Sequence, residues 1–254
     1  TELGWGIGAM GVGADYANNM TNIGRGYDVS ADPHIAYTTA AGLLPFGIQA
    51  SVGYAPNTAD GQSNSYKAGG AVTTSVADGT NATQYKVTAS PIDGLKVGAD
   101  YYETGGNKLG TVSQEKTGGN VYAQYAFGNF KVGYTKGKLE PAKTTNKYRT
   151  NVADTATALN GAQYESDGIG IEFAVNDQLS ISYSSEDFTR THKTMAATAS
   201  TNTRNSVTSE QRTIMAAYNI GGATLGVSLI DTSNSDYTAD REESKTIFSL
   251  ALAF

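Results

Sequence analysis

The stretch KTIFSLALAF, at 245–254, repeats with a period of two. Large apolar residues occupy every second position, and smaller residues stand between them: the large ones are Phe248, Leu250, Leu252 and Phe254. Side chains of a β-strand point alternately to the two faces of its sheet. The stretch therefore predicts a strand with one strongly apolar face.

Ten further segments upstream alternate in the same way. They lie at 34–40, 46–54, 85–89, 95–102, 121–127, 130–135, 169–173, 179–184, 213–219 and 224–229. A glycine-rich stretch at 3–12 is a twelfth candidate, with Leu3, Trp5 and Ile7 on one side. The period predicts an all-β protein of about twelve strands, forming one domain over 1–254.

The connections between these segments alternate in length. Short turns at 92–94, 128–129, 176–178 and 221–222 are separated by long polar stretches at 55–82, 103–119, 137–163, 187–209 and 231–243. Tight turns at one end and long loops at the other are typical of an antiparallel up-and-down transmembrane β-barrel. A soluble sandwich would scatter its Greek-key crossovers instead.

The composition of the two strand faces agrees with this architecture. One face is rich in Gly, Ser, Thr, Gln, Lys and Glu, which suit a water-filled lumen better than a dry core. Aromatic residues gather at strand ends, where a membrane barrel has its interfacial girdles, although ordinary cross-strand aromatic pairing is an alternative. They are Tyr54, Tyr85, Tyr101, Tyr125, Phe127, Phe130, Tyr134, Phe173, Tyr183 and Tyr218.

Overall composition excludes several classes of protein. The 254 residues include 30 Gly, 16 Tyr and no Cys, so disulfide scaffolds, cysteine zinc sites and thiol catalysis are ruled out. The net charge of −6 argues against a phosphate-binding surface and hence against nucleic acid as a partner. Only 17% of the residues are charged. We expect no cofactor.

The C-terminal Phe254, preceded by alternating apolar positions, resembles the assembly signal of outer-membrane β-barrel proteins from Gram-negative bacteria. The hairpin from His34 through 44–47 to Tyr54 resembles the general diffusion porins, at the strand pair that follows their inward-folded constriction loop. The resemblance implies a homotrimer in the outer membrane. It also places 13–33 where the constriction loop would lie.

Two departures from that family leave alternatives open. General porins have about sixteen strands, whereas this sequence predicts about twelve, so either the barrel is small or N-terminal strands are missing from it. They also carry a ladder of arginines opposite the constriction loop. Here His34 stands where a polar or basic residue is expected.

Parity along the strands places several charged residues in the lumen: Lys86, Lys96, Lys131, Lys245, Asp100 and Glu172, together with Tyr102, Tyr122 and Gln124. Asp15, Asp28 and Asp32 lie in the candidate constriction loop. Opposed charges of this kind predict a transverse field that filters solutes by size and sign. The alternative is that these are ordinary solvated side chains of a polar lumen.

Other signals are weaker. Residues 6–11 fit G-x-G-x-x-G without the strand and helix that a nucleotide site needs. The acidic stretch with Asp231, Asn234, Asp236 and Asp240 could hold Ca²⁺, but a solvated surface loop is the simpler interpretation. We expect no metal site. We expect His192 to lie in a Thr-rich loop, and no Ser-His-Asp arrangement is evident.

These observations favour a porin that lets small hydrophilic solutes and ions diffuse through a water-filled channel, in contact with outer-membrane lipid. We expect no enzymatic activity. One alternative is a structural or adhesive barrel with a closed lumen and partner-binding surface loops. Another is a barrel enzyme, which would need a Ser, a His and an acid close together near the lipid interface.

Overall fold

The computed structural model describes residues 33–56, 81–105, 112–114, 116–140, 143–144, 158–195 and 203–252. Eleven strands form one antiparallel sheet in sequence order. They are β1 (Ile35–Thr38), β2 (Gln49–Ala55), β3 (Ala82–Ala89), β4 (Leu95–Thr104), β6 (Lys116–Phe127), β7 (Phe130–Glu140), β9 (Ala158–Ala174), β10 (Leu179–Met195), β11 (Thr203–Asn219), β12 (Ala223–Ser233) and β13 (Glu243–Leu252). The eleven predicted strands outside 3–12 are thereby confirmed.

Smaller elements accompany this sheet. A separate two-stranded sheet pairs β5 (Val112–Gln114) with β8 (Lys143–Thr144). Two single-turn 3-10 helices also occur, η4 (Pro45–Gly47) and η6 (Ser235–Tyr237). No helix among the described residues has the length and apolar character needed to cross a membrane.

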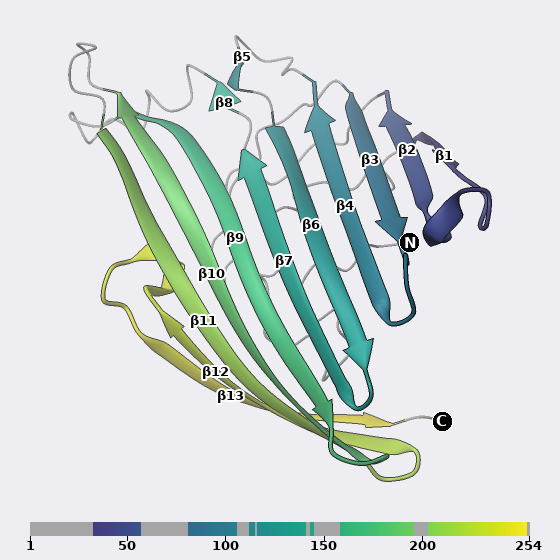
Figure 1. Cartoon of the computed structure of the whole chain (residues 1–254). Coiled ribbons are helices and arrows are strands. Elements are labelled where there is room, and N and C mark those ends of the chain that lie inside the picture. The colour runs from purple at the N-terminus through teal and green to yellow at the C-terminus, as the bar shows by residue number, and fades with distance from the viewer. Residues whose placement is uncertain are drawn as a thin grey trace.

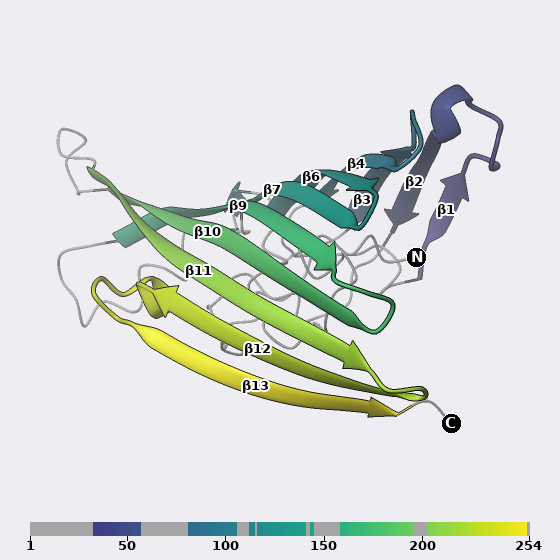
Figure 2. The ribbon, with the colours of Figure 1, turned by 60° about the horizontal axis from the view of Figure 1, so that its bottom comes forward.

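The large sheet curls into a trough (Figure 1). Figure 2 shows that neighbouring strands follow one another around the curve and that the trough is open between β1 and β13. The tight turns join strands at one end of the sheet, as the alternation of connection lengths predicts. Each of the ten strand pairings is antiparallel, which makes the sheet up-and-down throughout.

The two faces of the sheet differ sharply. Large apolar side chains are exposed on the convex face, including Val87, Val121, Ile169, Ile171, Ile181, Ile214, Leu229, Phe248 and Leu250. Polar side chains are buried on the concave face, including Gln84, Asp100, Asn120, Ser184, Glu186, Gln211 and Thr213. A water-soluble sheet protein would reverse this arrangement. Apolar-out and polar-in strands are the pattern of transmembrane barrels.

The predicted aromatic positions lie on the convex face. Nine of the ten are exposed, and Phe173 is half-buried. Close to the tight turns, four of them form a stacked chain across β6, β7 and β9. The ring centroids are 5.5 Å apart for Tyr125 and Phe127, 5.6 Å for Phe127 and Phe130, and 4.7 Å for Phe130 and Phe173. An outward aromatic band next to the turns has the position of an interfacial girdle.

Several predicted loops are partly strand. β7 continues to Glu140, β9 begins at Ala158, β10 continues to Met195 and β11 begins at Thr203, so the predicted loops at 137–163 and 187–209 are too long. Hydroxyl side chains bond across the extended strands: Thr189 Oγ1 lies 2.9 Å from Thr208 Oγ1. These segments have the composition of loops because polar residues predominate in them and the convex face carries no apolar band there, yet Thr favours strands and cross-strand pairs stabilise them.

Because the convex face is apolar, we expect a charged side chain introduced on it to destabilise the protein folded in a lipid bilayer. Ile171→Lys places an ammonium group in the apolar band, and we expect it to lower the free energy of unfolding by about 2–4 kcal/mol near the midplane. Gln124→Lys is the matched control on the concave face, where we expect little change. Denaturant unfolding in phospholipid vesicles measures both variants, and equal losses would contradict the assignment of the faces.

Candidate functional site: the concave wall

The concave face holds the predicted lumen residues, and the strand register places two of them, Lys86 and Asp100, in a row with Asn120. Lys86 on β3 pairs with Asp100 on β4, which pairs with Asn120 on β6. Asp100 Oδ1 accepts hydrogen bonds from the backbone N–H of Asn120 at 3.0 Å and from its Nδ2 at 3.1 Å. Asp100 is 8% exposed. This carboxylate is therefore fixed in the wall, between an amide and the cross-strand lysine.

Two tyrosines lie over glycines on either side of Asp100 along the strands β4 and β6. Tyr122 is the cross-strand partner of Gly98, and Tyr102 is the partner of Gly118. A Cβ at Gly98 would lie 2.3 Å from Tyr122 Cε1, and a Cβ at Gly118 would lie 2.6 Å from Tyr102 Cε1. Each ring thus occupies space that only glycine leaves open. The pairs join β4 and β6 and keep the rings flat against the wall.

The other predicted lumen charges also lie on the concave face. Lys131 on β7 and Glu172 on β9 form an ion pair, with Nζ 3.0 Å from Oε2. Lys245 pairs with Glu243 on the same strand at 3.2 Å. Lys96 lies opposite Gln124 and is exposed. Acids and bases are therefore mixed along this wall, and Lys131 has its partner within it.

The remaining predicted site residues lie elsewhere. His34 precedes β1 and is exposed. Asp15, Asp28 and Asp32 lie outside the described residues, as do the candidate strand 3–12 and all of 13–33 except Pro33. The transverse field across the opening stays a prediction. His192 belongs to β10, where it pairs with Asn205, so its assignment to a loop was wrong.

An apolar row on the concave face was missed from the sequence. It lies toward the long-loop ends of the strands and comprises Ala55, Ala82, Tyr102, Leu139, Tyr164, Phe188 and Tyr237, with Val207 packed against it. The exposed fractions are 0% for Tyr102 and Leu139 and 1% for Phe188. Apart from Tyr102, its larger members fall in polar stretches whose composition predicts loops. Strand parity applied beyond the apolar segments would have found Leu139 and Tyr164.

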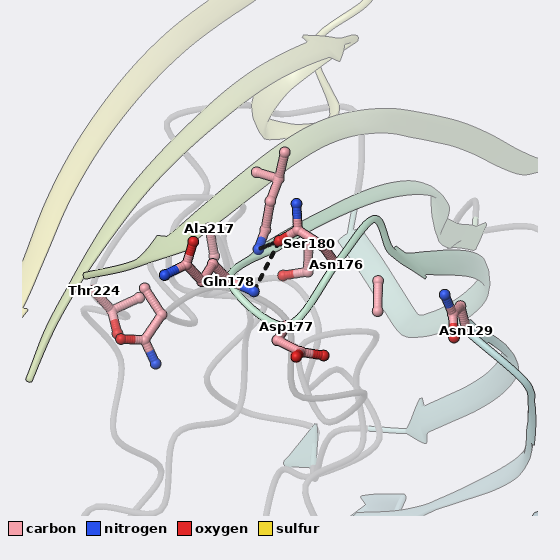
Figure 3. A pocket seen from close by; sticks show the side chains of 10 residues that line it. Asn129, Asn176, Asp177, Gln178, Ser180, Ala217 and Thr224 are labelled. Carbon is pink, nitrogen blue, oxygen red and sulfur yellow. Dashed lines mark hydrogen bonds between the residues drawn. The ribbon is translucent and has the colours of Figure 1, made fainter. Parts of the chain in front are cut away.

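Burial changes along the strands. The concave wall is buried near the long loops, whereas near the tight turns Lys131, Glu172, Ser180 and Ala217 are partly accessible. A pocket of about 390 Å³ opens at the turn end. Figure 3 shows its amide-rich lining, with Asn129, Asn176 and Gln178. Asn219 also lines the pocket. The wall is thus accessible at one end and covered at the other.

Asn176 shapes the rim of this pocket. Its Oδ1 accepts hydrogen bonds from the backbone N–H groups of Gln178 at 2.9 Å and Leu179 at 2.8 Å (Figure 3). This Asx-type turn satisfies two backbone donors where β9 leads into β10. The carboxylate of Asp177 is exposed beside it. The rim offers neutral amides and one acid, which suits water and small polar solutes.

The acidic stretch at 231–243 does not gather around one point. Asp231 on β12 accepts a hydrogen bond from Ser244 Oγ at 2.6 Å on the convex side. Asn234 instead contacts β11, where its Nδ2 donates to Thr208 O at 2.8 Å. Within the described part of the chain, no group of three or more His, Asp or Glu side chains is placed to hold a metal ion. The loop is solvated over residues 238–242, as a surface loop is expected to be, but Ser235 and Tyr237 are buried.

Comparison with known proteins supports the fold. The chain matches no known family model, and no curated protein matches it. A porin structure refined at 1.8 Å superposes with a TM-score of 0.50 at 12% identity, covering 85% of this chain and 60% of the porin. OmpT lacking loop L8, an outer membrane protein of Vibrio cholerae, superposes with a TM-score of 0.52 at 15% identity, covering 97% of this chain and 72% of OmpT. The chain has the outer-membrane β-barrel fold.

Because Tyr102 and Tyr122 pack directly on Gly118 and Gly98, we expect that a side chain larger than hydrogen at either glycine destabilises the protein. Gly118→Ala forces a methyl group into the ring of the fully buried Tyr102, and we expect a loss of about 1–3 kcal/mol in the free energy of unfolding. Gly98→Ala should cost less, because Tyr122 is only half-buried and its ring is less confined by neighbouring side chains than the fully buried ring of Tyr102. The decisive measurement is Gly118→Ala in a Tyr102→Ala background. A loss as large there as in the native background would refute the contact.

Proposed function

We propose that this chain forms the wall of a porin, a water-filled channel through which small hydrophilic solutes and ions diffuse passively. The observation that carries the proposal is the contrast between the two faces of the up-and-down sheet. The convex face has the apolar surface that lipid requires, and the concave face has the charged and amide side chains that a water-filled lumen requires. Partly accessible charges at Lys131 and Glu172 support solvation of the inside.

The proposal includes a location and an assembly. The resemblance of 245–254 to the assembly signal of outer-membrane β-barrel proteins supports insertion into the outer membrane of a Gram-negative bacterium, with the longer strands of the large sheet crossing it. The resemblance of residues 34–54 to the general diffusion porins supports a homotrimer. We further propose that the protein has no enzymatic activity and needs no cofactor. Its net charge of −6 argues against nucleic acid as a partner.

One observation favours a second candidate, a structural or adhesive barrel with a closed lumen. Many concave side chains are almost fully buried, including Gln84, Asn120, Glu186 and Gln211. A filled interior would bury them in the same way, and the long loops would then bind a partner outside. The porin is favoured because the burial of concave side chains ends short of the tight turns, where Lys131, Glu172, Ser180 and Ala217 stay partly accessible.

Single-channel recording separates the two candidates. We expect the purified, folded protein to insert into planar lipid bilayers and give stable conductance steps. Folding is checked by heat-modifiable mobility on gels, so that inactive material is recognised. Folded protein that inserts and yet gives no conductance would overturn the porin and favour the closed barrel.

Ion selectivity tests the lumen charges. Replacing Lys86, Lys96 and Lys131 together by Gln removes positive charge from the concave wall, and we expect the reversal potential in a salt gradient to shift toward cation preference. Glu172→Gln removes one negative charge instead, and we expect it to shift the potential the opposite way and by less, because it leaves Lys131 without its carboxylate. Selectivity and conductance unchanged in both variants would show that these side chains do not line the channel.

A further inference from the structure

The loop between β12 and β13 folds onto the concave face. It comprises residues 234–242 and lies at the long-loop end of the sheet, where η6 sits beside β11 (Figure 1). Ser235 is 2% exposed and Tyr237 is 4% exposed, whereas residues 238–242 are exposed. The loop therefore has a buried part, which contacts the concave wall, and an accessible part at residues 238–242.

Tyr237 is the main contact of this loop with the wall. Its ring centroid lies 5.9 Å from that of Tyr164 on β9. The guanidinium carbon of Arg190 on β10 lies 4.9 Å from the same ring centroid, within the range of a cation–π interaction. Tyr164 and Arg190 are cross-strand partners. Tyr237 thus docks on two adjacent strands and completes the apolar row.

Hydrogen bonds fix both ends of the loop. Asn234 Nδ2 donates to Thr208 O at 2.8 Å, and Asn234 Oδ1 accepts from the backbone N–H of Asp240 at 3.0 Å. Ser235 Oγ donates to Glu243 Oε2 at 2.7 Å, and the other oxygen of that carboxylate pairs with Lys245. These contacts tie the loop to β11 and β13 as well as to itself.

The backbone of the loop is held in an uncommon conformation. Tyr237 has φ of 56°, and Asn234 and Asp240 have φ of 50° and 62°. Asn and Asp visit the left-handed region fairly often, but a bulky aromatic residue there is an outlier. Such strain persists only where surrounding contacts determine the conformation. The docked ring of Tyr237 supplies those contacts.

We propose that the β12–β13 loop narrows the outer mouth of the channel, and that Tyr237 is the positioning residue that holds it against the wall. This inference rests on the proposed porin function. The loop covers the wall of β9 to β11 where the concave face is buried, so entering solutes meet residues 238–242 first. The loop selects among small hydrophilic solutes by size. It is separate from residues 13–33, the segment expected to form the constriction.

The first test removes the docking ring. Tyr237→Ala leaves the loop without its main contact, and we expect single-channel conductance to rise about 1.5-fold or more, with faster entry of larger sugars into proteoliposomes. Tyr237→Phe keeps the ring over Tyr164 and should restore the narrow channel. Folded Tyr237→Ala protein with the conductance and sugar cut-off of the native protein would overturn the proposal.

The second test works even where Tyr237→Ala fails to fold, and it uses the absence of cysteine from the chain. Thr238→Cys places a single thiol on the exposed side of the loop. A bulky thiosulfonate reagent should reduce conductance in this variant. Lys138→Cys is the control, because Lys138 is exposed on the convex side of β7 and modification there should leave conductance unchanged.

The outcomes separate this inference from the proposed function. No conductance from folded native protein defeats the porin. Native conductance, with no loss when the thiol at position 238 is modified, defeats the narrowing loop and leaves the porin standing. Conductance that falls at position 238 and stays unchanged at position 138 supports the proposal.

Discussion

A backbone that crosses lipid has no water to bond with, so each N–H and C=O needs a partner within the protein. The ladder from β1 to β13 meets that demand strand by strand, and its register decides which side chains meet lipid. Slipping β9 by one residue against β10 would exchange Ile171 and Glu172 between the faces. Both the apolar surface and the charged wall therefore depend on the same hydrogen-bonded register.

The concave wall is divided along the strand direction. Near the tight turns it is polar and partly accessible, and Lys131 and Glu172 are paired there. Near the long loops it carries the apolar row with Leu139 and Tyr164, and apolar surface left in water costs about 25 cal/mol per Å². Docking Tyr237 on that row removes apolar area from water. The apolar row therefore explains why the loop at 234–242 folds inward. The same row limits the polar, accessible part of the wall to the end near the tight turns.

The sequence predicted the eleven strands and the aromatic positions because period two is a local signal that each segment carries by itself. The prediction of strands failed where the sequence does not alternate clearly between apolar and polar residues. Thr189 and Thr208 lie in strand extensions where polar residues predominate and the convex face is no longer apolar, so the alternation is weak there and the pairing of the two residues shows the strands. The direction of the last loop was missed for another reason: Tyr237 meets Tyr164 through the fold, and nothing near either residue in the sequence indicates the contact.

Whether the number of strands is odd or even decides how the sheet can close into a barrel. Among the described residues, β1 and β13 each have an unpaired edge, and ten successive antiparallel pairings make these two strands run in the same direction. Direct pairing between them would be parallel, whereas bacterial outer-membrane barrels have an even number of strands and close with an antiparallel pair. Antiparallel closure therefore requires an odd number of further strands. One more gives twelve and five more give sixteen, so both of the expected strand counts satisfy the requirement, whereas eleven strands alone do not.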